Sequence, residues 1–398
     1  MIHNPFVIHA QNRMEVEQEL ARQGVKPSDR ERFADEGEPL QLHMERLAFE
    51  EAALLRSEMR LLGGDAAVHD NPARPDLADL YIRGTHGQWL GLLDRIPDQT
   101  KGLREAAAEV RELLTMRRQL QQRKAILCKD RVLPLGQKTL VMGILNVTPD
   151  SFSDGGRYTD IERAVAQARA LVDAGADIID IGGESTRPGS APVELAEELD
   201  RVIPVVRALA RELSIPLSVD TYKAEVADQA VRAGAHIIND VWGAKKDRRI
   251  ADVAAQHEVP IILMHNREDT AYTHFFSDMI RDLRESVAIA REAGVKGELI
   301  ILDPGIGFAK SLEQNLEAMR RLDDLVALGY PVLLGTSRKS MIGRVLDLPV
   351  EERVEGTAAT VALGVAKGCH IVRVHDVKEM KRVTAMMDAM LKGGGLIG

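Results

Sequence analysis

Eight short runs of apolar, often β-branched residues alternate with longer segments from residue 138 onward, and this alternation limits the fold more than any other feature. The runs are Thr139–Asn146, Asp177–Gly182, Ile215–Asp220, His236–Asp240, Val259–His265, Leu299–Pro304, Pro331–Ser337 and His370–His375. Such alternation predicts parallel strands joined by crossover helices. Eight strand–helix units in about 260 residues match the size of a (β/α)8 barrel, whereas a doubly wound sheet would more often stop at about five or six strands. The sequence therefore predicts an α/β fold with a TIM barrel over residues 136–398.

The segments between the runs carry helix signals. Apolar residues recur at three- and four-residue spacing in Leu195–Leu213, Ala224–Ala233 and Leu312–Leu328. This is the period of an amphipathic helix. Gly175 directly after Asp173-Ala174 is typical of a helix end.

Polar residues stand at or just after the ends of nearly all these runs. They are Asn146, Glu184, Asp220, Asn239 with Asp240, His265, Asp303, Ser337, and Arg373 with His375. In a TIM barrel the C-terminal ends of the strands build the active site. The sequence therefore predicts one polar pocket at that end of the barrel.

Residues 1–135 have a different character and predict a small α+β domain without an internal repeat. Met44–Leu62 has helical period and ends at Gly63-Gly64, Asp79–Gly84 is a candidate strand, and Gly102–Gln122 is a second helix. A linker is expected near Lys124–Gly136. This extension could support the barrel by packing, contribute to a dimer interface or bind a partner enzyme, and packing support is the preferred interpretation.

Composition excludes several classes of protein. A formal net charge of −9 argues against a broad nucleic-acid surface but allows a small anionic substrate. Cys128 and Cys369 lie far apart without metal-ligand spacing, so we expect buried, reduced thiols. No stretch approaches the roughly 20 apolar residues of a membrane span, and Met1–Arg13 lacks the pattern of a secretory signal. We therefore expect a cytoplasmic protein that binds neither nucleic acid nor membrane.

Two long segments follow the first two predicted strands. Asn146–Gly156 is polar and too long for a minimal connection, which is typical of loops that complete a site, although a solvated surface loop is the simpler alternative. Gly182–Gly189 combines glycines, a proline and Arg187, and an arginine so placed suits a carboxylate or phosphate. A surface ion pair is the alternative for Arg187.

Together with five later segments, these two resemble the dihydropteroate synthase family. The later segments are Ser218–Lys223, Ile238–Asp240, Asp303–Phe308, Ser337–Gly343 and Val372–Asp376. The resemblance runs in order through residues 138–380, roughly the whole barrel. Glu58–Val68 is also similar to a segment that precedes the barrel in longer members of the family, without indicating what that segment does.

The resemblance implies a role for each matching residue. Asp220, Asn239 and Asp303 match the positions that hydrogen-bond the pterin ring, against which Met264 packs and beside which Lys339 lies. Asn146, Arg373 and His375 match the groups around the pyrophosphate, and Asn146 also helps to hold Mg²⁺. The residues that match the 4-aminobenzoate pocket are Phe152, Thr186, Arg187, Pro188, Phe308 and Ser340.

The resemblance also implies the reaction. The enzyme would be a transferase that condenses 6-hydroxymethyl-7,8-dihydropterin pyrophosphate with 4-aminobenzoate, with Asp220, Lys339, Arg373 and His375 as catalytic residues. Members are commonly homodimers. Ile306 stands where many relatives have Phe, which exchanges one apolar side chain for another. A simple role as helix cap or turn former is preferred for Asp240 and Asp376.

Two other functions stay open. A corrinoid-type pterin-dependent methyltransferase shares the acidic and amide positions, but it lacks the combined Thr148–Phe152 and Ser337–Ser340 segments found here. A non-catalytic pterin-binding barrel is also possible because a fold does not fix a function. Loss of Asn146, Lys339 or Arg373 would favour that reading, and all three are present.

Overall fold

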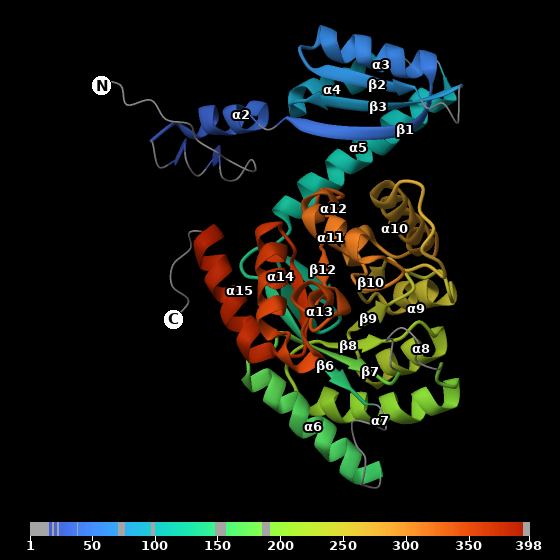
Figure 1. Ribbon diagram of the computed structural model, residues 1–398, viewed down its shortest axis with the longest axis vertical. Helices are drawn as coiled ribbons and strands as arrows, with labels where there is room; N and C mark the ends of the chain where they lie inside the picture. Colours follow the sequence, from blue (N-terminus) through green and yellow to red (C-terminus); the bar gives the residue numbers. More distant parts are fainter. Residues whose placement is uncertain are drawn as a thin grey trace. The chain divides into compact units, whose positions relative to one another are not determined.

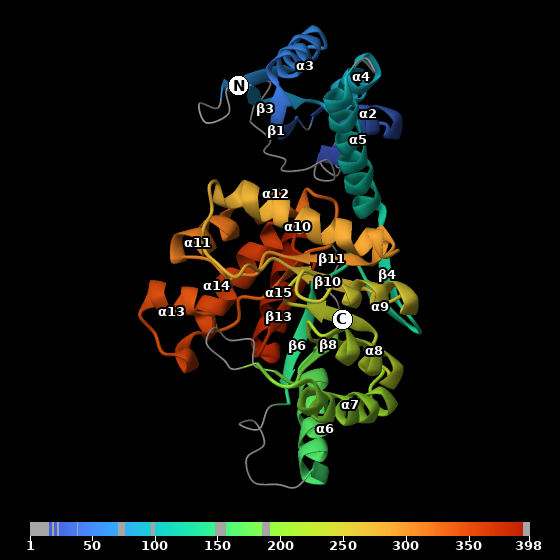
Figure 2. The ribbon, with the colours of Figure 1, turned by 90° about the vertical axis from the view of Figure 1, so that its right-hand side faces the viewer.

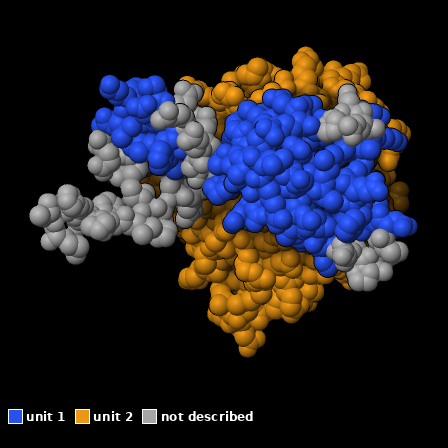
Figure 3. Space-filling model, turned by 90° about the horizontal axis from the view of Figure 1, so that it is seen from above, with its two compact units in different colours: residues 1–114 blue, residues 115–398 orange. Residues whose placement is uncertain are grey.

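The computed structural model describes residues 16–17, 20–21, 24–37, 39–70, 76–96, 100–147, 157–184 and 192–392. The chain divides into two compact units, Met1–Leu114 and Thr115–Gly398 (Figure 3). This division falls earlier in the chain than the expected boundary between residues 135 and 136, inside one long helix.

The first unit is an α+β structure built on a three-stranded antiparallel sheet in the order β1-β3-β2. Its elements are α2 (Pro27–Gly37), β1 (Leu40–Ala48), α3 (Phe49–Leu61), β2 (Asp65–Asp70), β3 (Leu77–Gly84), α4 (His86–Arg95) and α5 (Lys101–Gln122), the last of which crosses the boundary. The core gathers Leu55 and Met59 of α3, Leu80 and Ile82 of β3, and Trp89 of α4. The indole of Trp89 also donates a hydrogen bond to the carbonyl of Leu40 at 3.3 Å.

Two expectations for the N-terminal region are corrected. The helix expected over Met44–Leu62 begins only at Phe49, because residues 40–48 pair with β3 as a strand, with Met44 opposite Leu80. The linker expected near Lys124–Gly136 contains a hairpin, β4 (Ala125–Cys128) and β5 (Arg131–Pro134). Its buried side chains belong to the barrel core, which a linker would not.

The second unit is the predicted TIM barrel (Figures 1 and 2). Its strands are β6 (Leu140–Asn146), β7 (Ile178–Gly182), β8 (Leu217–Asp220), β9 (Ile237–Asp240), β10 (Ile261–Met264), β11 (Ile300–Asp303), β12 (Leu333–Leu334) and β13 (Ile371–Val374). They form a parallel sheet in the order β11-β10-β9-β8-β7-β6-β13-β12. A parallel bridge between Leu302 and Val332 joins the two ends and closes the barrel. Each strand lies inside one of the eight apolar runs.

Helices surround the closed sheet. They are α6 (Arg157–Asp173), α7 (Leu195–Glu212), α8 (Ala224–Ala233), α9 (Arg249–His257), α10 (Phe275–Glu292), α11 (Leu312–Arg320), α12 (Leu322–Val326), α13 (Ser340–Leu346), α14 (Val354–Ala366) and α15 (Val377–Lys392). The helix predicted over Leu312–Leu328 is two helices, because Arg321 leaves helical geometry at φ −111° and ψ 23°. Strands such as β8 to β11 are buried at every residue, which is why their sequences are mainly apolar apart from the polar residues at their C-terminal ends and Ser218.

Further expectations concern thiols and membranes. Cys128 and Cys369 are buried and unpaired, as expected, and burial raises the pKa of the Cys128 thiol to about 12. In the part of the chain that the structure describes, no helix combines the length and apolarity needed to cross a bilayer.

Candidate active site

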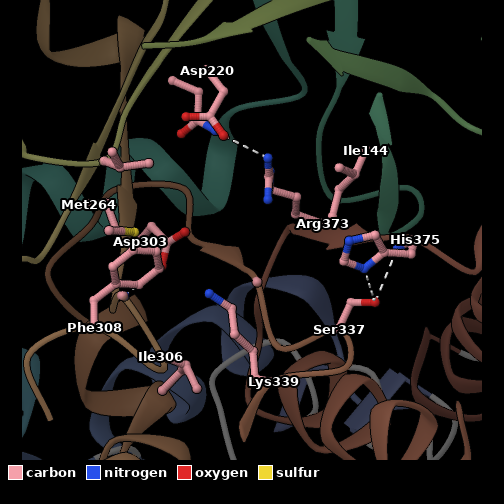
Figure 4. Close-up of a pocket in the computed structure, with 14 residues that line it drawn as sticks. Ile144, Asp220, Met264, Asp303, Ile306, Phe308, Ser337, Lys339, Arg373 and His375 are labelled. Atoms are coloured by element: carbon pink, nitrogen blue, oxygen red, sulfur yellow. Dashed lines mark hydrogen bonds and ion pairs between the residues drawn. The ribbon is translucent and has the colours of Figure 1, made fainter. Parts of the chain in front are cut away.

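A pocket lies at the C-terminal end of the barrel strands (Figure 4). The space between its walls, part of it open to solvent, is about 470 Å³. It is lined by Ile144, Asp220, Asn239, Val241, Met264, Asp303, Gly305, Ile306, Phe308, Gly335, Ser337, Lys339, Arg373 and His375. All five residues predicted to contact the pterin line this pocket, together with Arg373, His375 and Phe308.

Arg373, on β13, lies between two buried carboxylates. Its Nε donates to Oδ2 of Asp180 at 2.6 Å, and its Nη2 donates to Oδ2 of Asp220 at 2.8 Å. Figure 4 shows the guanidinium pointing toward Asp220. Burial raises the pKa of the Asp220 carboxyl to about 7, the nearby charge of Arg373 opposes that rise, and Asp180 adds to it. One cation therefore faces two acidic groups.

Asp180 was not among the residues predicted for the site. It is fully buried in β7, where Ile179 and Ile181 flank it, and its Oδ2 also accepts from Nδ2 of Asn239 at 3.0 Å. A charged residue inside an otherwise apolar strand was the available signal, because such a group is almost never fully buried unless paired. Asp180 lies inside its strand, so the pattern of polar residues at strand ends does not indicate it.

Asp303, at the end of β11, is oriented by the turn that follows it. Its Oδ1 accepts a hydrogen bond from the backbone N–H of Gly305 at 2.7 Å. Burial raises the pKa of its carboxyl to about 6, although the positive charge of Lys339 opposes the rise. Gly305 has φ 65° and a Cβ there would lie 2.0 Å from the carbonyl oxygen of His265, so this turn requires glycine.

Lys339 lines the same pocket as Asp220 and Asp303. Its amine sits 4.1 Å from the centre of the Phe308 ring, a cation–π contact. In Figure 4 the amine points into the pocket toward Asp303 and Arg373. The lysine thus presents a positive charge beside an aromatic wall.

Arg338, between Ser337 and Lys339, has a left-handed backbone with φ 56°, which is uncommon for a residue with a side chain. Its guanidinium pairs with both carboxylate oxygens of Asp376 at 2.9 and 2.5 Å. The backbone N–H of Arg338 donates to the hydroxyl oxygen of Thr357. These contacts offset the backbone strain and fix the turn that places Ser337 and Lys339 in the pocket. Asp376 is thus the ion-pair partner of Arg338.

His375 extends the pocket next to this turn. Its backbone N–H donates to Oγ of Ser337 at 3.1 Å, and its Nδ1 lies 3.0 Å from the same oxygen. Asp240, which ends β9, accepts from the backbone N–H groups of Trp242 and Ala244, as expected for a turn former.

The other predicted residues fall outside the pocket lining or outside the described residues. Asn146 ends β6, and its Oδ1 and Asp220 both border Gly182, where a Cβ would be 3.9 Å from that oxygen and 3.6 Å from Cβ of Asp220. Ser340 is exposed at the start of α13 and does not line the pocket. The structure does not describe Phe152, Thr186, Arg187 and Pro188.

Lys310 is a half-buried lysine whose amine contacts the segment that forms part of the pocket wall. Its amine donates to the carbonyls of Gly305 at 2.9 Å and Phe308 at 3.1 Å, and lies 2.7 Å from Nδ1 of His265. It therefore holds the segment that carries Ile306 and Phe308. Burial lowers the pKa of Lys310 to about 7.

The pKa of Lys310 predicts a pH dependence of stability. Between pH 7 and 10 the unfolded chain binds the proton of Lys310 more tightly than the folded chain, so the free energy of unfolding rises with pH there by up to about 1.4 kcal/mol per unit. We expect Lys310→Met to remove this rise, as urea denaturation at four pH values would measure. Lys296→Met, which removes an exposed lysine paired with Glu258, is the control. Parallel curves for Lys310→Met and wild type would contradict the prediction.

Comparisons with known proteins agree with this geometry. The family described as pterin binding enzyme matches residues 142–375. Dihydropteroate synthase of Bacillus subtilis is 61% identical over 277 residues, which cover 70% of this chain and 97% of the relative.

Solved structures give the same result. Xanthomonas albilineans dihydropteroate synthase with 4-aminobenzoic acid is 43% identical with a TM-score of 0.64, covering 67% of this chain and 98% of that one. The Yersinia pestis enzyme in a sulfonamide drug complex is 39% identical with a TM-score of 0.63, covering 68% of this chain and 100% of that one. This chain is longer than these relatives.

The fold and the pocket thus define a pterin-binding enzyme. Within that class, the chain belongs to the dihydropteroate synthase family of transferases.

Proposed function

We propose that the protein condenses 6-hydroxymethyl-7,8-dihydropterin pyrophosphate with 4-aminobenzoate to give 7,8-dihydropteroate and pyrophosphate, in the cytoplasm. The observation that carries the proposal is the convergence of Asp220, Asn239 and Asp303 with Lys339 and Arg373 around one pocket. Hydrogen-bond acceptors and cations that line the same pocket suit a ligand with an N–H-rich ring and an anionic tail.

The acceptors suit the pterin ring. Its amino group and ring N–H offer donors, which the carboxyl groups of Asp220 and Asp303 and the amide oxygen of Asn239 accept. Met264, buried on β10, supplies a polarizable apolar surface for the ring. The ring is thereby fixed with its methylene carbon toward the cations.

The cations suit the leaving group. As the bond between the methylene carbon and the pyrophosphate oxygen breaks, negative charge gathers on the pyrophosphate, and Arg373 and His375 stabilise it more in the transition state than in the ground state. The carboxylates of Asp220 and Asp303 offset the positive charge that spreads over the pterin. The arylamine then forms the new C–N bond and loses a proton, so no enzyme nucleophile is needed.

Asn146 is the proposed protein ligand of Mg²⁺. Its amide oxygen and Asp220 both border Gly182 at the strand ends, and a single hard oxygen donor fits an ion that commonly keeps waters and substrate phosphates in its coordination shell. When bound, Mg²⁺ would neutralise charge on the pyrophosphate.

The second substrate would bind next to Lys339. Phe308 offers an aromatic surface at the pocket and Ser340 a hydroxyl at the start of α13. Phe152, Thr186, Arg187 and Pro188 complete the proposed 4-aminobenzoate site, and the X. albilineans relative is described with 4-aminobenzoic acid.

A pyrophosphate-release assay with the purified full chain tests the function. Release should require the pterin pyrophosphate, 4-aminobenzoate and Mg²⁺ together, and the product should be 7,8-dihydropteroate. Tight pterin binding without release would favour a non-catalytic barrel, and methyl transfer from a methylated pterin would favour the methyltransferase.

We further propose that the protein is a homodimer through α14 and α15. Apolar side chains lie exposed on these packed helices, with 38% of Leu363, 59% of Met386 and 58% of Met390 accessible. Light scattering should give twice the chain mass of 43.8 kDa, and Met386→Glu with Met390→Glu should give the monomer mass. Leu127→Glu, at an exposed position on β4, is the control. A wild-type monomer would refute the dimer.

A further inference from the structure

Asp180 connects the two sides of the pocket although it does not line it. Its Oδ2 accepts from Arg373 on β13 and from Asn239 on β9, and its side chain is fully buried. One oxygen atom thus contacts both a proposed pyrophosphate-binding cation and a proposed pterin-binding amide.

The contact with Asn239 sets the direction of that amide. Because Nδ2 of Asn239 donates to Asp180, its Oδ1 is left as the group to offer to a ligand in the pocket that Asn239 lines. With Asp220 and Asp303, all three pterin-facing side chains then act as acceptors. A carboxylate at position 180 can only accept, so it selects this orientation over the flipped one.

The contact between Asp180 and Arg373 holds the guanidinium near the pocket. Arg373 uses Nε for Asp180 and Nη2 for Asp220, so the two carboxylates hold different nitrogens. A pterin N–H that takes Oδ2 of Asp220 displaces only Nη2. The Nε contact then retains the arginine while its Nη groups turn to the pyrophosphate.

We propose that Asp180 is a positioning residue that sets the acceptor orientation of Asn239 and anchors Arg373 when the pterin occupies Asp220. The proposal rests on the proposed function. Loss of a purely structural residue would lower stability and would change the KM values of both substrates alike. Loss of a positioning residue should raise the KM of the pterin pyrophosphate and leave that of 4-aminobenzoate nearly unchanged.

Asp180→Asn tests the proposal with little change in volume. An amide at position 180 can donate to Asn239 and flip it, and it no longer attracts Arg373. We expect the KM for the pterin pyrophosphate to rise about 10- to 100-fold and kcat to fall, while the KM for 4-aminobenzoate stays within about threefold. Titration of the chain with 6-hydroxymethylpterin alone, followed by pterin fluorescence, should show the same loss of affinity without turnover.

Two further variants control for folding. Asp388→Asn replaces another buried carboxylate of the barrel, which accepts from the backbone N–H and Oγ1 of Thr139, and it should leave both KM values unchanged. Asp180→Glu keeps the charge and should restore part of the pterin affinity. If Asp180→Asn folds poorly, the pterin affinity of Asp180→Glu still tests the proposal.

The outcomes are distinct. Equal changes in both KM values, or unchanged pterin affinity in an active enzyme, would overturn the role of Asp180. An inactive wild-type chain that still binds the pterin would instead overturn the proposed function. The role of Asp180 would then be tested by the titration alone, as the difference in pterin affinity between wild type and Asp180→Asn.

Discussion

Arg373→Ala should lower kcat by about 10²–10³-fold, because it removes a donor that stabilises the departing pyrophosphate. Arg373 also supplies the counter-charge for two buried carboxylates. Among the described residues it is the only cation within hydrogen-bond distance of both Asp180 and Asp220. Without it, Asp180 and Asp220 lose their counter-charge, and the pKa of Asp220, which Arg373 holds down, rises further. Protonated Asp220 would then offer the pterin a poorer acceptor, so the KM for the pterin should rise as well.

Steady-state kinetics on three variants would separate charge from geometry. Arg373→Lys keeps one charge but cannot bridge two carboxylates through separate nitrogens, so it should recover only part of kcat. Arg232→Ala removes an exposed arginine of α8 that pairs with Asp228, and it should behave as wild type. A kcat for Arg373→Ala near the wild-type value would remove the arginine from the proposed chemistry.

The barrel could be predicted closely from the sequence because its strands are buried on both faces. Such strands read as mainly apolar runs, and each predicted run contains the observed strand. The shortest strand, Leu333–Leu334, is much shorter than the predicted run Pro331–Ser337. The hydrogen bonds between strands define the length of the strand, whereas the apolar run marks only which residues are buried. In the N-terminal unit, Met44 lies in β1, a half-buried strand whose apolar residues also match helical spacing. The helix predicted from residue 44 was therefore wrong for this segment.

Part of the pocket lining could be predicted from polar groups at strand ends, although Asn146 and His265 stand at such ends and do not line the pocket. The carboxyl ends of parallel strands converge, so Asp220, Asn239 and Asp303 had to meet. The ion pairs could not be predicted, because they join residues such as Asp180 and Arg373 whose separation in sequence says nothing about side-chain direction. Arg373 was assigned to the pyrophosphate alone, and its hold on two buried carboxylates became visible only in three dimensions.

Asp220→Asn should reduce kcat/KM for the pterin pyrophosphate by about 10²-fold or more, equivalent to about 3 kcal/mol, because an amide places donors against the donors of the ring. The expected effect on stability has the opposite sign. Burial raises the pKa of Asp220 to about 7, so the folded chain binds its proton more tightly than the unfolded chain does between about pH 4 and 7. This stabilising contribution is lost as the pH rises through 7, and above that pH the charged carboxylate costs stability.

Asparagine has no such cost, and it leaves Arg373 paired with Asp180 as a neutral couple. The Asp220→Asn variant should therefore unfold at pH 8 at a temperature no lower than wild type, while its activity is lost. Asp240→Asn is the matched contrast, because burial also raises the pKa of Asp240 to about 7, but both its oxygens accept backbone N–H groups. That variant should lose stability and keep its KM for the pterin. If Asp220→Asn unfolded early and bound the pterin normally, Asp220 would be a structural residue and the acceptor site would have to be placed elsewhere.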